Sequence, residues 1–424
     1  MSMDTSAEPR RRFAPSPFIL RGLAIVAVIL GLLSVASRLA FIYSPRGITN
    51  DFTQDYVSAR AWMDGLDPYG DTTQLVNRYF GPNSPYDAID KYGQGGTPHP
   101  PTMIIAVRAL AGLPYKAARV CWLILMAGAA ALALGWFARL IGAKRHTAIV
   151  IGIGGLAIPT VQTDLVYGQS NGLLLLLLVV AWWALERDKQ RQAGIALGIA
   201  TAFKIFPFLM LIPLLRMRNY RAAVWTAGVT GGTTVIAGLV MGFSRTISFI
   251  RTVSPANVRF WRAAPMNLSL LSVPYRWLTK SVWRPLSASA PALAGVIAAG
   301  FLIMLLVAAF RNRARPVGDV FWAAVPFVLL ATPTVWETYL VLLIPGAFLL
   351  IRSLMEGQRF RYFWPILIAQ AVVLIGLFPG LPPALHMSTT AQLLGYSLPM
   401  YGLVVLCIGS FVAVRIESSP AVAA

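Results

Sequence analysis

Long apolar runs, separated by short clusters of arginine and lysine, constrain this chain more than any other feature of its sequence. The first run covers residues 18–43, and about 20 apolar residues are enough for a helix to cross a bilayer. Hydrophobic residues make up 57% of the 424 positions and charged residues only 12%, whereas soluble domains are about one-quarter charged. The sequence therefore predicts an all-α polytopic membrane protein in which nearly all of the chain is embedded.

The basic residues indicate orientation rather than a nucleic-acid partner. The formal net charge is +20, which in a soluble protein would suggest nucleic acid. Here the lysines and arginines flank the apolar runs, as they do where positive loops stay on the cytoplasmic side of a membrane. Cys121 and Cys407 lie far apart within apolar runs, so we expect neither a disulfide framework nor a cysteine-based metal site.

The charge pattern predicts about ten transmembrane helices within a single domain at residues 18–415. The predicted spans are 18–43, 115–141, 147–161, 172–185, 222–242, 291–310, 317–332, 340–351, 363–378 and 398–414. Residues 1–17 and 416–424 are predicted to be cytoplasmic tails, the first of them disordered. Residues 44–100 and the basic segment 243–289 are predicted to lie outside the cytoplasm.

Residues 193–215 do not fit a simple crossing, because basic clusters flank them on both sides. One crossing would place the cluster that begins at Arg216 outside. The sequence breaks between Lys204 and Pro207, so we predict a re-entrant hairpin that enters from the cytoplasm and holds Lys204 deep inside. The alternative is that Lys204 reaches back to the cytoplasmic interface.

The first outer segment carries two carboxylates on one face of a predicted helix. Asp51 and Asp55 are four residues apart, so a helix places them on the same side. Apolar residues recur beside them at helical spacing, namely Phe52, Tyr56, Ala59 and Met63. The pattern predicts an acidic amphipathic helix at the membrane surface, whose carboxylates suit a catalytic base or a cation site; a merely solvated helix is the alternative. A second, partly inserted helix is predicted at 102–113, after Pro100 and Pro101.

Four groups of polar residues fall at the predicted outer ends of spans. They are Asp51 with Asp55, Gln169 with Asn171, Asn267 with Ser269, and Trp336 with Glu337 and Tyr339. Polar groups in apolar surroundings are costly unless they are paired or used, so we predict a shared outward-facing cavity. The alternative is that each group caps its own helix.

The basic segment 243–289 contains no acidic residue. Arginine binds phosphate oxygens with two parallel hydrogen bonds, so Arg259, Arg262 and Arg276 suit the phosphate of a substrate. Lys204, from the predicted hairpin, would add a further positive charge. Contact of the arginines with anionic lipid is the alternative.

These polar residues resemble the motifs of glycosyltransferase family 87, in the polyprenyl-phosphate-sugar-dependent C-type superfamily. The matching positions run over nearly the whole chain: Asp51, Phe52, Tyr56, Ala59, Gly65, Asp67, Pro68 and Tyr69; His99-Pro100-Pro101; Gly168-Gln169 and Asn171; Ala193-Gly194 with Phe203-Lys204 and Pro207; Asn267-Leu268-Ser269-Leu270; and Pro333, Trp336, Glu337 and Tyr339. His99 stands where the family pattern has tyrosine, Leu268 where it has glutamine, and Thr338 where it has histidine. The last departure puts a histidine-dependent step at that turn in question.

The resemblance implies a C-type fold and an inverting glycosyltransferase. One sugar, with mannose the common choice in the family, would move from a polyprenyl-phosphate carrier to a hydroxyl of a lipid-linked or cell-envelope glycan. The site would face outward from a bacterial inner membrane and use no cofactor. Asp51 would be the catalytic base, with Asp55 in reserve. The site is expected to hold no metal; a divalent ion held by Asp51, Asp55 and Glu337 is the alternative.

We also predict binding roles for individual residues. Lys204, Arg259, Arg262 and Arg276 would bind the donor phosphate. The substrates would contact Tyr56, His99, Gln169, Asn171, Asn267, Ser269, Trp336, Glu337 and Tyr339. The expected partners are the lipid-linked donor, the glycan or glycolipid acceptor and membrane lipids, but not nucleic acid. Two other functions stay open: a transporter or flippase of a phosphorylated lipid-linked sugar, and a ligase that moves a whole glycan.

Overall fold

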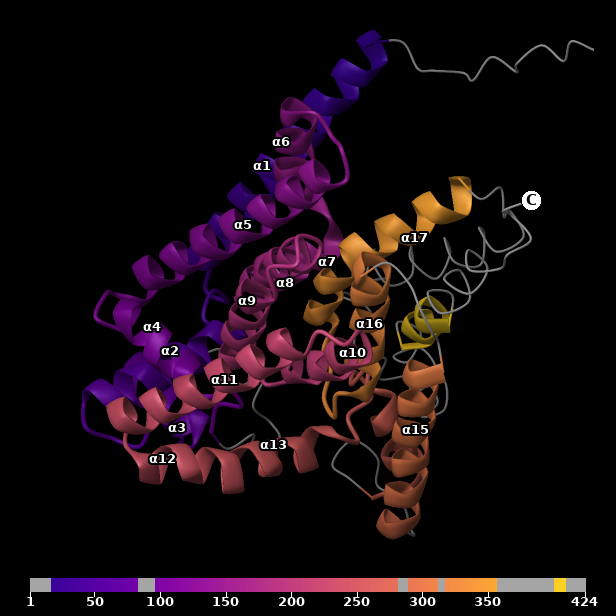
Figure 1. Ribbon diagram of the computed structural model, residues 1–424. Coiled ribbons are helices and arrows are strands. Elements are labelled where there is room, and N and C mark those ends of the chain that lie inside the picture. The colour runs from indigo at the N-terminus through magenta and orange to yellow at the C-terminus, as the bar shows by residue number, and fades with distance from the viewer. Residues whose placement is uncertain (1–16, 83–95, 281–288, 312–316, 357–399, 409–424) are drawn as a thin grey trace, which may run out of the picture.

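The computed structural model describes residues 17–82, 96–280, 289–311, 317–356 and 400–408. These residues form helices joined by turns, without a strand among them, which confirms the all-α prediction. Figure 1 shows α1 (Pro17–Tyr43), α5 (Tyr115–Leu140) and α6 (Arg145–Gly154) stacked on one side of the molecule, with α15 (Pro291–Arg311) on the other.

Three helices in the described residues are long and apolar enough to cross a membrane: α1, α5 and α11 (Tyr220–Met241). They match three of the predicted spans. The predicted third span, 147–161, takes a different form. Here α6 and the short η2 (Gly155–Ala157) are followed by α7 (Pro159–Tyr167), with a bend of 62°, because Pro159 cannot continue the helical hydrogen bonds.

Counting the bent pair as one crossing gives up to four spans in the described residues, fewer than the ten predicted. The helices α8 (Asn171–Leu185), α15 and α16 (Val317–Ala331) coincide with other predicted spans, but their described apolar parts are shorter than a full crossing. The predicted span 363–378 and most of 398–414 lie outside the described residues.

Small residues let the N-terminal helices approach closely. A side-chain carbon on Gly31 of α1 would lie 2.0 Å from the carbonyl oxygen of Ile153, and one on Gly152 would lie 2.5 Å from that of Ala131 in α5. α6 is thus pressed between α1 and α5. Such contacts are typical of helices that associate in a membrane, and the outer face of α1 is left exposed and apolar.

The first outer segment forms α2 (Asp51–Met63), α3 (Thr72–Phe80) and, after Pro100, α4 (Pro101–Ala111). The helices α2 and α4 were predicted and α3 was not. The burial of nine of the 13 residues of α2 disfavours the alternative of a merely solvated helix. Rings from α2 and α5 pack together there: Phe52 stacks on Trp122 at 5.5 Å, and Tyr56 meets Tyr115 edge-on at 5.2 Å.

The predicted break near Lys204 is present. α9 (Gln190–Phe203) ends there, Lys204 itself is extended, and the chain continues as η3 (Phe206–Met210) and α10 (Leu211–Arg216). The position of this segment relative to a bilayer stays a prediction.

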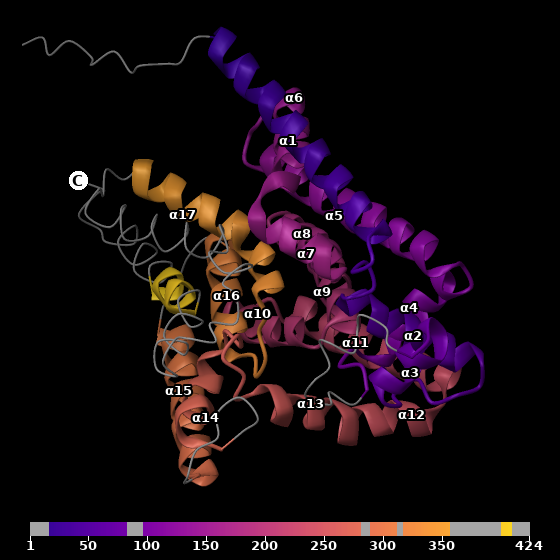
Figure 2. The same cartoon turned by 180° about the vertical axis from the view of Figure 1, so that it is seen from behind.

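The basic segment is largely helical. α12 (Phe243–Ser248), the π-helical turn η4 (Phe249–Val253) and α13 (Ser254–Trp261) follow one another along one end of the molecule, beneath α2 and α3 in both views (Figure 2). Phe249 lies 5.3 Å from the ring of Tyr69, which joins this segment to the first outer segment. η5 (Leu270–Ser272) and α14 (Val273–Leu278) lead to α15, and η6 (Glu337–Leu343) and α17 (Ile344–Glu356) follow α16.

Candidate active site

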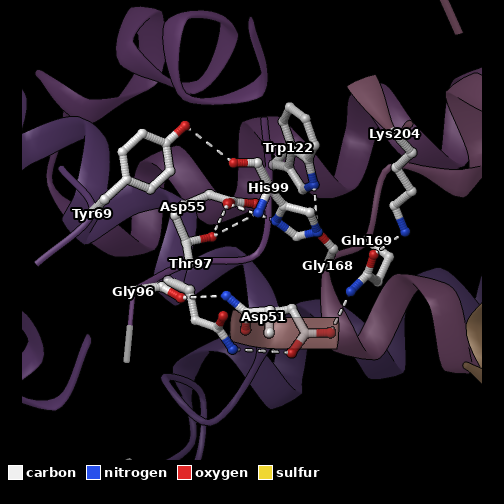
Figure 3. A network of polar contacts seen from close by, with 12 residues as sticks. Asp51, Asp55, Tyr69, Gly96, Thr97, His99, Trp122, Gly168, Gln169 and Lys204 are labelled. Atoms are coloured by element: carbon white, nitrogen blue, oxygen red, sulfur yellow. Dashed lines mark hydrogen bonds and ion pairs between the residues drawn. The ribbon is translucent and has the colours of Figure 1, made fainter. Parts of the chain in front are cut away.

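The centre of the candidate site is a chain of three side chains from distant parts of the sequence (Figure 3). Asp51 is the first residue of α2, Gln169 lies in the turn between α7 and α8, and Lys204 lies at the break after α9. The Gln169 Nε2 donates a short hydrogen bond to Asp51 Oδ2, and its Oε1 accepts one from Lys204 Nζ. The fold therefore brings together three of the residues that the sequence analysis selected.

Asp51 lies in surroundings suited to a general base. Burial raises the pKa of its carboxyl above the ordinary range, because the charged form loses solvation. The hydrogen bond from Gln169 and the positive charge of Lys204 oppose this rise. A raised pKa brings the carboxylate nearer to the pH at which an enzyme works, where a general base is most effective.

Lys204 is buried, with 3% of its surface exposed. Its ammonium lies 4.0 Å from the centre of the Tyr339 ring, which itself stacks on Phe206 at 4.9 Å. In the described part of the chain no carboxylate lies within ion-pair distance of Lys204. The ammonium is thus held by a neutral amide and a ring face, and its inward position disfavours the alternative of a side chain reaching for the cytoplasmic interface.

The turn that carries Gln169 is fixed from α5. Trp122 Nε1 donates to the carbonyl of Gly168 at 2.7 Å, and Arg119 donates to the carbonyls of Leu165 and Val166 at 2.5 and 3.0 Å. Gly168 has a φ of 68°, a left-handed conformation that favours glycine. Sequence reasoning missed Arg119 and Trp122, although an arginine inside an apolar run is itself a signal of a buried role.

Asp164, on α7, is a second residue that the sequence analysis did not select. It accepts hydrogen bonds from Asn171 Nδ2 at 2.7 Å and from the backbone N–H of Gly172 at 3.2 Å. Asn171 also donates to the carbonyl of Thr338 at 3.1 Å. Asn171 is therefore occupied within the protein, although we expected it to bind substrate.

Asp55 belongs to a separate buried cluster. Its Oδ1 lies 2.7 Å from His99 Nδ1 and 3.1 Å from Thr97 Oγ1, and only 1% of its surface is exposed. Figure 3 shows this cluster beside the Asp51–Gln169–Lys204 chain rather than as part of it. The geometry favours a structural role for Asp55 and His99 over the expected reserve base and substrate contact.

The turn before η6 adds three of the expected residues to the site. Burial raises the pKa of Glu337, and the negative charge of Asp51 raises it further. Trp336 is half-buried and packs edge-on against Trp261 at 5.0 Å. Tyr339, within η6, covers the ammonium of Lys204.

Three other expected substrate contacts are engaged elsewhere. Tyr56 donates to the carbonyl of Leu113 at 2.8 Å. Asn267 donates to the carbonyls of Trp261 and Pro333 and accepts from the backbone N–H groups of Ser269 and Val335. The Ser269 hydroxyl caps η5 by accepting from the N–H of Leu271 at 3.1 Å. These bonds favour structural roles, and those of Asn267 fasten the 261–269 loop to the turn before η6.

The three expected phosphate-binding arginines differ in their surroundings. Arg259 is exposed on α13, and Arg262 lies over the Tyr275 ring at 4.3 Å. Arg276 is buried and donates to the carbonyl of Pro265 at 3.0 Å. Lys204 differs from these arginines because its ammonium donates a hydrogen bond to Gln169, the residue that also binds Asp51.

The alternative of a divalent ion finds no support in the described residues. None of their histidine, cysteine, aspartate and glutamate side chains form a group of three or more that could hold a metal. Asp51, Asp55 and Glu337 therefore do not converge as that alternative requires.

Comparison with known proteins gives three relatives. An Alpha-(1->3)-arabinofuranosyltransferase of Corynebacterium glutamicum is 28% identical over 198 residues, which are 45% of this chain and 43% of that protein. A Polyprenol-phosphate-mannose-dependent alpha-(1-2)-phosphatidylinositol pentamannoside mannosyltransferase of Mycobacterium tuberculosis is 24% identical over 324 residues, 75% of this chain and 70% of that protein. A Polyprenol-phosphate-mannose-dependent alpha-(1-2)-phosphatidylinositol mannoside mannosyltransferase of the same species is 26% identical over 224 residues, 49% of this chain and 48% of that protein.

The match to two of these relatives spans less than half of their length. No solved structure gives a significant match to the chain. The sequence pattern of Glycosyltransferase family 87 matches residues 98–333, which is more than half of the 424 residues. This region contains Gln169 and Lys204 and begins after Asp51. The chain therefore belongs to glycosyltransferase family 87.

Proposed function

We propose that this protein is an inverting glycosyltransferase that moves one sugar from a polyprenyl-phosphate carrier to an acceptor hydroxyl. Residues 18–415 would act as one membrane-embedded catalytic domain, with the site on the outer face of a bacterial inner membrane. The acceptor is a lipid-linked or cell-envelope glycan. Family membership and the names of the three relatives support this class of reaction.

The observation that carries the proposal is the placement of Asp51 and Lys204 at the two ends of the Gln169 amide. Asp51 accepts the proton of the acceptor hydroxyl as that oxygen attacks the anomeric carbon. The bond between the anomeric carbon and the phosphate oxygen breaks, and polyprenyl phosphate leaves with the electron pair. The ammonium of Lys204 stabilises the charge on the leaving phosphate. A single displacement inverts the anomeric centre and requires no sugar–enzyme intermediate.

Mannose is the proposed sugar because two of the relatives are named for a polyprenol-phosphate-mannose donor. The arabinofuranosyltransferase makes arabinofuranose the competing candidate. The purified protein in lipid nanodiscs should be given polyprenyl-phosphate-linked mannose or arabinofuranose together with a panel of acceptor glycolipids. The product should gain the mass of a single mannose and carry an inverted anomeric configuration.

Two variants connect this assay to the site. Asp51→Asn and Lys204→Gln should each abolish most of the transfer, whereas Arg259→Gln, on the exposed face of α13, should reduce it far less. A donor lipid that crosses the bilayer without any transferred sugar would instead support a flippase. A product that gains a whole glycan would support a ligase.

A further inference from the structure

The carboxylate of Asp164 is the buried charge near the site that the proposed reaction does not use. Only 1% of its surface is exposed. One oxygen accepts from Asn171 Nδ2 and the other from the backbone N–H of Gly172. It thus sits at the N-terminus of α8, where free N–H groups and the helix dipole stabilise a negative charge. Asp164 is held rigidly by these bonds.

Two series of contacts connect Asp164 to Lys204, one through Gln169 and one through Asn171 and the segment that carries Tyr339. The backbone carbonyl of Asp164 accepts from the N–H of Gln169 at 3.1 Å, and the Gln169 side chain accepts from Lys204. Asn171 connects Asp164 to the carbonyl of Thr338, the residue before Tyr339. The ring of Tyr339 in turn covers the ammonium of Lys204. The two charges interact electrostatically, although no direct ion pair joins them.

We propose that Asp164 is a positioning residue, a fixed counter-charge that is kept out of direct contact with Lys204. It holds the lysine ammonium charged and leaves the N–H donors that Gln169 does not use open to the phosphate of a polyprenyl carrier. This inference rests on the proposed function. A buried ammonium without a counter-charge is costly and tends to lose its proton. A direct ion pair would remove that cost but would occupy the donors that a phosphate needs. Asp164 avoids both outcomes because Asn171 and Gly172 hold its oxygens.

Other charged or titratable groups also face this pair. Asp51 and Asp55, from α2, interact with Lys204 electrostatically, and Tyr339 from η6 contacts it. Arg119, from α5, interacts with Asp164. Asp51 already accepts from Gln169, and Asp55 is bonded to His99 and Thr97. Asp164 is therefore the carboxylate near Lys204 that neither the reaction nor the Asp55 cluster uses.

The test measures binding rather than turnover. The full-length protein in nanodiscs is titrated with polyprenyl phosphate and with the uncharged polyprenol, from mildly acidic to alkaline pH. Wild type should prefer the phosphate, and Lys204→Gln should lose that preference at every pH. Asp164→Asn should weaken phosphate binding by up to roughly tenfold at alkaline pH, because each pKa unit of stabilisation that the ammonium of Lys204 loses lowers its charged fraction by up to that factor. This loss should grow as the pH rises, because Lys204 then loses its proton earlier.

Asn171→Ala is the matched control, because it breaks the same hydrogen bond and leaves the charge at Asp164. If Asp164 were only a structural brace, Asn171→Ala would weaken phosphate binding as much as Asp164→Asn does, and neither loss would depend on pH. That result would overturn the proposal, as would unchanged phosphate binding by Asp164→Asn.

A variant that does not fold can still decide the question. If Asp164→Asn cannot be purified, the double variant Asp164→Asn with Lys204→Gln should recover folded protein, because Lys204 is then no longer a buried charge without its counter-charge. Failure of the double variant would favour the brace and reject the counter-charge. If wild type prefers polyprenyl phosphate but transfers no sugar, the proposed function is rejected. If wild type transfers sugar normally and the phosphate binding of Asp164→Asn does not depend on pH, only the counter-charge role of Asp164 is rejected.

Discussion

Asp51 and Lys204 are joined through the two ends of one amide, since Gln169 donates to the carboxylate and accepts from the ammonium. A glutamine can make both bonds only when the groups on either side differ in character, one accepting and the other donating. The amide thereby fixes the two charges at a set separation and keeps them from pairing directly.

Replacement of Asp51 by asparagine should remove the base without changing its shape. We expect kcat to fall about 10²- to 10⁴-fold, the usual contribution of a positioned general base. The measurement is initial-rate transfer from polyprenyl-phosphate-mannose. Asp55→Asn is the comparison, since Asp55 is bonded to His99 and Thr97. Transfer that survives in Asp51→Asn and disappears in a folded Asp55→Asn protein would reverse the assignment.

The pH dependence should report on Asp51. Its pKa is raised by burial and lowered by the Gln169 hydrogen bond, burial being the larger effect. The base works only when ionised, so activity falls as the pH drops through this pKa. Gln169→Leu removes a donor that favours the ionised form, so the pKa should rise and the acidic limb of kcat/KM should move to higher pH. Gln54→Leu is the control, because it removes a longer contact of 3.5 Å to the same carboxylate and should move the acidic limb less. If the acidic limb of Gln169→Leu moved to lower pH instead, Gln169 would not be stabilising the ionised form of Asp51.

The Asp55–His99 pair should act on stability rather than on substrate affinity. His99→Leu leaves a buried carboxylate whose remaining side-chain partner, among the residues that the structure describes, is Thr97. Removal of one member of a buried pair costs about 3–5 kcal/mol, so the unfolding temperature in detergent should drop markedly. The double variant Asp55→Asn with His99→Leu should be more stable than His99→Leu alone. An unchanged unfolding temperature with a raised KM would restore His99 as a substrate contact.

Gly168→Ala should disturb both stability and activity. The alanine would be forced into the left-handed conformation at φ 68°, and its Cβ would lie 2.7 Å from the Cβ of Phe52. A strained backbone position of this kind costs about 1–3 kcal/mol, and relief of the clash would move the neighbouring Gln169. Gly228→Ala, at a helical position with nothing within 4 Å, is the control and should be neutral or slightly stabilising. Equal effects of the two substitutions would show that the Gly168 turn does not hold Gln169.

Much of the helical framework and the central part of the site could be predicted because both depend on local patterns. Runs of about 20 apolar residues predict spans, and α1, α5 and α11 follow them closely. Asp51, Gln169 and Lys204 stand at the ends or breaks of such runs, where a buried polar side chain needs a partner. Their convergence followed from the predicted topology.

The remaining parts of the site depend on side-chain partners that no spacing in the sequence reveals. Asp164 was placed in a loop because the chain around it is polar, but α7 continues through it to Tyr167. Arg119 and Trp122 lie inside the apolar helix α5. The arginine signals a buried role, but nothing in the sequence shows that both side chains bind carbonyls of the segment that carries Gln169. Asn171 and Asn267 were expected to face a cavity, yet their amides are used to bind backbone groups. Only tertiary contacts separate a polar residue that faces substrate from one that fastens two loops together.

Asn267 provides the clearest test of that distinction. Its side chain makes four hydrogen bonds that fasten the 261–269 loop to the turn carrying Trp336 and Glu337. Asn267→Leu would remove the side-chain partner of the Ser269 and Val335 N–H groups and of the Pro333 carbonyl, at a cost of about 1–3 kcal/mol for each group left unsatisfied. We therefore expect a large drop in unfolding temperature and a loss of kcat as Glu337 moves, while the KM for donor in the surviving protein changes little. Asn77→Leu on the half-exposed surface of α3 is a control for the substitution itself. If Asn267→Leu unfolds like wild type and raises only the KM, the side chain contacts substrate, as its place in the family motif had suggested.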